Sequence, residues 1–202
     1  MSIESLHRRA AEICSEVFVG EVVEAARLAY EERVTRVAQL KAAQGKLVQD
    51  AKELSEGRRE AARQIEDGLI ESKIDGRKWS PSESLDRLAK LDAHHRLVTA
   101  ANSKVLERLL PAAEIASLEL AAAHYRTQAS ALREVAEDRL RKTTELMADA
   151  AEHEGSIVFD PTQTLSGILH QQAAELELQA TNHQTWAEQR KEEHFRLVGE
   201  ER

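Results

Sequence analysis

The chain reverses direction at residues 75–85, which read DGRKWSPSESL. Ser80 is a favourable N-cap residue, Pro81 suits the first position of a helix, and Glu83 stands where a capping box requires a carboxylate. A second stretch, residues 155–165, reads GSIVFDPTQTL and repeats this arrangement 80 residues later. Each stretch therefore predicts the end of one helix and the start of the next.

Between these turns, apolar residues recur at steps of three and four, which is the spacing of one face of an α-helix. The pattern predicts three helices over about residues 2–74, 81–154 and 161–200. On the third helix the predicted core stripe consists of Leu165, Leu169, Leu176, Trp186 and Leu197.

Composition supports an all-α fold. Ala, Leu, Glu, Lys and Arg make up more than half of the 202 residues, and the chain has only eight glycines and three prolines. These values are typical of long helices and exclude β-sandwiches, disulfide-rich scaffolds and repeated βα units. The single cysteine, Cys14, excludes an intramolecular disulfide. Since no transmembrane run and no apolar signal-peptide core occur, we expect a cytoplasmic protein without a membrane partner.

The unequal helix lengths predict the architecture. Antiparallel folding through short loops gives a three-helix bundle from residues 1–44 and 112–202. Residues 45–111 then form a projecting two-helix coiled-coil hairpin arm with its tip near residues 75–80. Pro111 and Gly45 would meet where three helices become two, a position suited to a bend.

An alternative arrangement has the first helix breaking at Gly45, Gly57 or Gly68, so that the arm folds back into a globule of four or five helices. The similarity between the two turns also has two explanations. Residues 4–8 match residues 83–87, which suggests an internal repeat. Shared helix-start chemistry produces the same resemblance without duplication.

Charge differs between the two predicted parts. Residues 45–111 carry 13 basic and 12 acidic side chains, whereas the rest of the chain carries 15 and 24. The overall charge of −8 argues against a chain that coats nucleic acid along its whole length. The returning limb, residues 76–111, is the only net-basic segment, and its simplest interpretation is a solvated helix face.

No catalytic or nucleotide-binding motif is present. Glu4 and His7 have the Glu-x-x-His spacing of di-iron bundles, and Asp92 with His95 is a variant of it, but the two pairs fall at different levels of the predicted fold. We therefore expect no metal site, no cofactor and no enzymatic activity. Cys14 is predicted to be a small core residue, because no partner base is evident.

His95 and Asn102 lie seven residues apart on one helical seam. A polar residue at a core position fixes the register or oligomeric state of a coiled coil, and we predict that role for both. The alternative is a histidine switch that responds to pH.

The two turns provide candidate partner-binding residues. Arg77, Lys78 and Trp79 lie at the predicted arm tip, where an aromatic ring beside two cations suits recognition of a partner. The opposite turn offers a second candidate surface, formed by Ile157, Val158 and Phe159. In both turns the aromatic residue has an alternative role, which is to cover the end of a helix.

These features predict a helical scaffold, adaptor or assembly subunit that acts through protein partners and forms a homo-oligomer or joins a larger complex. The alternative is a nucleic-acid-associated factor that uses the basic limb and tip of the arm.

Overall fold

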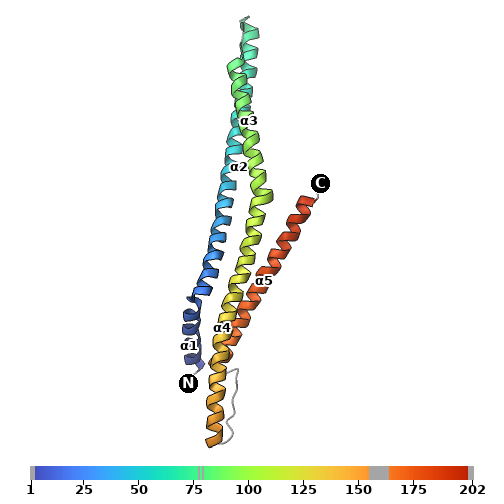
Figure 1. Cartoon of the computed structure of the whole chain (residues 1–202). Coiled ribbons are helices and arrows are strands. Elements are labelled where there is room, and N and C mark those ends of the chain that lie inside the picture. Colours follow the sequence, from blue (N-terminus) through green and yellow to red (C-terminus); the bar gives the residue numbers. More distant parts are fainter. Residues whose placement is uncertain (1–2, 77, 79, 155–163, 200–202) are drawn as a thin grey trace. The chain divides into compact units, whose positions relative to one another are not determined.

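The computed structural model describes residues 3–76, 78, 80–154 and 164–199, with side chains for all of these except 3, 149–154 and 197–199. Four long helices pack side by side within two units, and the described residues contain no strand (Figure 1). The fold is all-α, as predicted. Among the described helices, none is both long and apolar enough to cross a bilayer.

The predicted first helix is divided in two. Helix α1 spans Ile3–Phe18 and α2 spans Glu21–Asp75, so the expectation of one helix over residues 2–74 is wrong at its N-terminal part. The Gly20 N–H donates to the Val17 carbonyl at 3.1 Å, and the Gly20 carbonyl accepts from Glu24 N–H at 2.9 Å. The alternative breaks at Gly45, Gly57 and Gly68 are absent, because α2 continues through all three.

The predicted second helix contains a π-helical turn. Helix α3 spans Ser82–Lys104, η1 spans Val105–Leu109 and α4 spans Leu110–Glu154. Proline cannot donate to the carbonyl four residues earlier, and its ring crowds that carbonyl. The wider turn precedes Pro111 directly, and Leu110 N–H bonds to the Val105 carbonyl five residues back. The proline is therefore accommodated by one extra residue in the preceding turn.

Two helix starts differ from the predicted caps. Pro81, not Ser80, occupies the N-cap position of α3, and this N-cap has no side-chain hydrogen bond, so the predicted Ser80 cap is not formed. Helix α5 spans Leu165–Gly199 and starts four residues later than predicted. The Thr164 hydroxyl caps it by accepting from Gly167 N–H at 3.1 Å. The predicted Asp160 cap lies outside the described residues.

The chain forms two compact units. Unit 1 comprises residues 1–35 and 114–202, and unit 2 comprises residues 36–113. The predicted division at residues 44/45 and 111/112, with its projecting arm, stays a prediction.

Unit 1 has a core where α1, α4 and α5 meet. Ile13, Leu132 and Leu169 are its largest fully buried side chains. They are surrounded by four buried alanines, Ala10, Ala129, Ala136 and Ala173. Polar bonds join the same helices: Ser166 Oγ donates to the Ala136 carbonyl at 2.7 Å, and Cys14 Sγ donates to Gln172 Oε1 at 2.8 Å.

Small residues line the buried face of α5. Ala173, Ala180 and Ala187 recur every seven residues and are at most 1% exposed. Trp186, which the sequence placed in the core stripe, is 50% exposed, so that assignment is wrong. A prediction based on the large apolar residues of a helix overlooks a buried face made of alanines. Alanine side chains are small, so a neighbouring helix can approach more closely. On α4, the side chains of Ala122, Ala129, Leu132 and Ala136 are buried.

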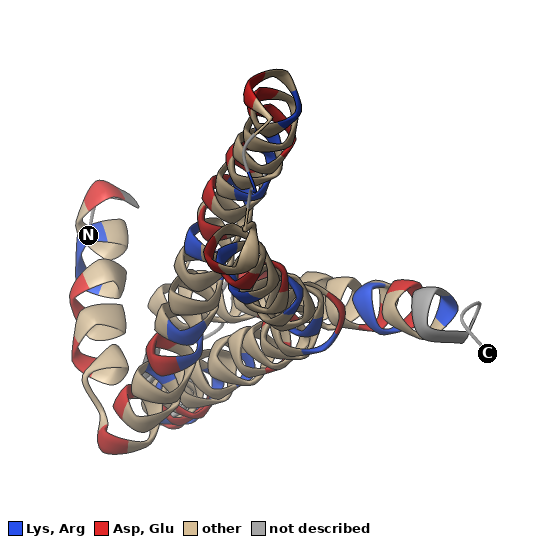
Figure 2. Cartoon of the chain, turned by 90° about the horizontal axis from the view of Figure 1, so that it is seen from above, with Lys and Arg blue, Asp and Glu red and all other residues tan. Residues whose placement is uncertain are grey.

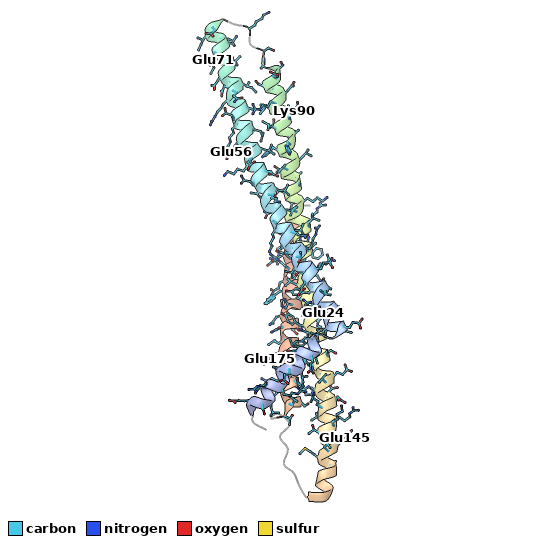
Figure 3. All side chains as sticks on the ribbon, turned by 90° about the vertical axis from the view of Figure 1, so that its left-hand side faces the viewer. Glu24, Glu56, Glu71, Lys90, Glu145 and Glu175 are labelled. Atoms are coloured by element: carbon cyan, nitrogen blue, oxygen red, sulfur yellow. The ribbon has the colours of Figure 1, made fainter. Side chains whose placement is uncertain are left out.

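Unit 2 contains an antiparallel pair of helices formed by α2 and α3 (Figure 1). In Figure 3, α3 with Lys90 runs beside the part of α2 that carries Glu56 and Glu71. The covered residues of α2 follow the alternating four- and three-residue steps of a coiled coil: 40, 44, 47, 51, 54, 58, 61, 65, 68 and 72. Those of α3 and η1 do the same: 84, 88, 91, 95, 98, 102 and 105. We call these two series the seam; the π-turn lengthens the next step, from Val105 to Leu110, to five residues.

Candidate interaction surfaces

The predicted tip and opposite-turn residues are mostly outside the described part of the chain. Lys78 is exposed, whereas Arg77 and Trp79 are not described. Ile157, Val158 and Phe159 also fall outside the described residues. Their role in partner binding stays a prediction.

His95 and Asn102 both lie on the α3 seam and are half-buried. Asn102 Oδ1 is buried and accepts no hydrogen bond from any described residue. A buried amide oxygen without a hydrogen-bond partner costs about 1–3 kcal/mol of stability. The register-setting role of the two residues stays a prediction.

Unit 1 holds a histidine–aromatic cluster that the sequence analysis did not identify as a group. Tyr30 of α2 stacks on His124 of α4 with ring centroids 6.2 Å apart. Tyr125 stacks on His183 of α5 at 5.4 Å, and His183 meets the edge of Trp186 at 5.0 Å. The rings thus link three helices, since His124 and Tyr125 are neighbours on α4 with centroids 5.6 Å apart.

The surroundings of the two imidazoles in this cluster disfavour their protonated form. His124 and His183 each have a buried Nδ1 that no described group bonds. Burial lowers the pKa of both imidazoles. For His124, the nearby Arg27 lowers the pKa further, while Glu31 opposes this effect. The cluster is a polar layer of the helix packing that resists protonation.

The sequence contained a partial signal for this cluster. His183 falls between Ala180 and Ala187 at the three- and four-residue steps of the buried stripe on α5. His124 directly precedes Tyr125 in the sequence of α4. The pairing of the two histidines through Tyr125 depends on the relative register of α4 and α5, which periodicity within one helix does not contain.

A groove of about 540 Å³ lies where the α1–α2 break faces α4. Its lining combines apolar residues, among them Val17 and Val23, with the charged residues Glu21, Arg126 and Glu134. The groove is more open than enclosed, unlike typical small-molecule sites.

Metal and thiol chemistry find little support in the described residues. No group of three or more His, Cys, Asp or Glu side chains in the described part of the chain is placed to hold a metal ion. The Cys14 thiol is half-buried, and burial raises its pKa, which disfavours the reactive thiolate.

Ion pairs tie α4 to α5 on the outside of unit 1. Arg133 pairs with Glu177, and Lys191 Nζ lies 2.5 Å from Glu119 Oε1. These pairs are exposed and contribute at most about 1 kcal/mol each. Basic and acidic segments alternate along the ribbons rather than separating into large single-sign blocks (Figure 2).

Comparisons of the chain with protein-family models, curated proteins and solved structures find no match.

Proposed function

We propose that this chain is a non-enzymatic helical scaffold, adaptor or assembly subunit that acts through protein–protein contacts, including contacts with further copies of itself. The observation that carries the proposal is the exposure of large apolar side chains on unit 2. Its described residues bury five apolar side chains: Leu40, Ala61, Val98, Val105 and Ala113. They leave eight large ones exposed: Val48, Leu69, Ile70, Ile74, Leu85, Leu97, Leu106 and Leu109.

Two paired helices can cover only one face of each other, and helical stability in proteins comes mainly from such packing. Scattered exposed apolar residues are ordinary, but a concentration of them on a helix pair with so small a core marks an interaction surface. Contact with a partner would cover these residues and strengthen the helix pair.

In this proposal, residues 45–111 form an arm that presents contacts away from the bundle, with its tip near residues 75–80. Arg77, Lys78 and Trp79 would contribute at the tip, because tryptophan and arginine are frequent energetic centres of protein interfaces. Ile157, Val158 and Phe159 would form the second contact at the opposite turn.

The experiment is light scattering coupled to size-exclusion chromatography on the full chain over a wide range of concentrations. We expect a mass above the 22.6 kDa of one chain that falls on dilution. Replacing Ile70 and Ile74 by glutamine should lower the mass at a given concentration, since both are exposed and apolar. A mass of one chain at every concentration would contradict self-association.

The same samples test the alternative of nucleic-acid binding. If the chain binds nucleic acid, its affinity for nucleic acid should fall steeply with added salt. That affinity should be lost when Arg77, Lys78 and Trp79 are replaced together. The scaffold proposal expects no such salt-sensitive binding.

A further inference from the structure

Four of the exposed apolar residues on unit 2 occupy equivalent positions. Three of them directly follow a seam residue after which the heptad takes its four-residue step: Val48 and Leu69 on α2, and Leu85 on α3. Leu106 on η1 directly follows the seam residue Val105, where the π-turn lengthens that step to five residues. Their exposed fractions are 47%, 47%, 47% and 43%. In an antiparallel coiled coil these equivalent positions on the two helices lie on the same side of the seam. We call these four residues the apolar edge.

The equivalent positions between these four hold small residues and one charged residue that forms an ion pair. The equivalent sites between Val48 and Leu106 also hold Ser55, Ala62 and Thr99. The remaining site holds Asp92, which forms an ion pair with Arg58. The apolar edge therefore forms a strip whose one charged residue is paired within the hairpin.

The length of the strip matches a helix. Val48 and Leu69 are 21 residues apart, as are Leu85 and Leu106. At 1.5 Å per residue, each row is about 32 Å long, or about six helical turns. Two parallel rows of this length on neighbouring helices form the kind of shallow groove into which an amphipathic helix lays its apolar face.

The outer flank of the apolar edge is basic. Positions four residues beyond the edge sites lie next to them on the helix surface, farther from the seam. On α2 these positions hold Lys52, Arg59, Glu66 and Lys73. On α3 the only charged one is Arg96. Four exposed cations and one exposed carboxylate therefore border the strip, and the cations come from both helices.

The other side of the hairpin differs, because its charges complement each other within the pair. There α2 presents acidic residues, namely Asp50, Glu53, Glu60, Asp67 and Glu71. The facing side of α3 presents Arg87, Lys90 and Lys104, together with one carboxylate, Glu83. Beside the apolar edge, by contrast, the flank positions of the hairpin supply only one carboxylate, Glu66, against four cations.

We infer that the apolar edge binds an amphipathic helix with acidic flanks, supplied by a partner protein, so that the helix pair becomes a three-helix bundle. The apolar stripe of that helix covers Val48, Leu69, Leu85 and Leu106, and its carboxylates meet the basic flank. Two copies of this chain placed edge to edge would bring the basic flanks together, which argues against a second copy at this surface. The inference rests on the proposed function, because it identifies one partner of the scaffold.

The test uses the full chain and two synthetic helical peptides of about 21 residues, the length of the strip. Both carry leucine at the two core positions of three heptads; one has glutamate at all flanking positions and the other has lysine. Fluorescence anisotropy measures the Kd of each labelled peptide. We expect the glutamate peptide to bind at least roughly tenfold more tightly, with an affinity that falls as salt is added.

Variants locate the site. Leu69→Glu with Leu85→Glu should weaken binding of the glutamate peptide by roughly tenfold or more. Leu97→Glu is the matched control, because Leu97 is 71% exposed on α3 but lies away from the apolar edge; it should change the Kd by less than about twofold. The reversal K52E/R59E/R96E should switch the preference to the lysine peptide. Circular dichroism confirms that each variant retains its helix content.

Several outcomes would overturn the inference: equal binding of the two peptides, no binding of either, or equal effects of the edge and control variants. So would edge-dependent binding of anionic phosphatidylserine vesicles or of duplex DNA without binding of the glutamate peptide. A dimer that L69E/L85E dissociates would assign the edge to a second copy instead. If the chain self-associates but does not bind the peptide, this inference is wrong and the proposed function is still supported. If the chain is a monomer that binds the glutamate peptide, the inference is supported and self-association is contradicted.

Discussion

Replacing Leu169 by alanine tests whether α1, α4 and α5 share one core. Leu169 is 0% exposed and belongs to the same cluster as Ile13 of α1 and Leu132 of α4. Leucine-to-alanine changes in cores cost about 2.7–5.0 kcal/mol, and the cost grows with the cavity that remains. Several neighbours of Leu169 are alanines, which have no side-chain rotamers that could fill the space. We therefore expect a loss of about 4 kcal/mol in the free energy of unfolding.

The assay is unfolding in guanidinium chloride followed by circular dichroism. For a slope of about 4 kcal/mol per molar denaturant, a loss of about 4 kcal/mol lowers the midpoint by about 1 M. Because the chain has two compact units, the shift is expected in the transition that reports on unit 1.

Leu178→Ala is the matched control, since it makes the same chemical change on the same helix. Leu178 is 62% exposed, so its loss should cost less than about 1 kcal/mol. Equal midpoint shifts for the two variants, or a loss below about 1 kcal/mol for L169A, would refute a core shared by the three helices.

Three further predictions follow from local geometry. Because the pKa values of His124 and His183 are lowered from the ordinary 6.5 in the folded chain, the unfolded chain takes up protons first as the pH falls. The two histidines should therefore lower the free energy of unfolding below about pH 6.5 and leave it unchanged above that pH. Denaturant midpoints that do not change between about pH 7.5 and 5.5 would contradict this. Gly45→Ala should stabilise α2 by about 0.5–1 kcal/mol and raise the melting temperature, because nothing lies within 4 Å of an added Cβ. Gly76→Ala should lower the melting temperature, because Gly76 has a φ of +66°. Thr164→Ala should cost about 1 kcal/mol through loss of the α5 cap, measured by denaturant unfolding, and Thr164→Ser should restore most of that loss.

Helix boundaries were predictable where local chemistry decides them. The start of α3 was placed within one residue, because proline and its neighbours restrict the backbone whatever surrounds them. Helix α5 begins at Leu165, later than predicted, and the Thr164 hydroxyl, which the sequence analysis did not single out, caps its first turn.

The candidate surfaces were also predictable only in part from the sequence. Most of the heptad seam of unit 2 could be read from sequence, because a 4–3 repeat fixes which positions of a helix are covered by its neighbour. The basic flank beside the apolar edge was hidden in the sequence analysis, since segment charges average over all faces of a helix. α2 between residues 45 and 75 is net acidic, yet Lys52 and Arg59 stand beside the edge.

The sequence by itself determined the all-α class, the reversal of the chain near residues 75–82 and the seam of the hairpin, because each depends on interactions within a few helical turns. Only the tertiary structure showed the alanine face of α5, the exposure of Trp186 and the stacking of Tyr125 on His183. These features depend on the distance and register between helices that are remote in the chain. Many small contacts set that register together, and the periodicity of a single helix does not record them.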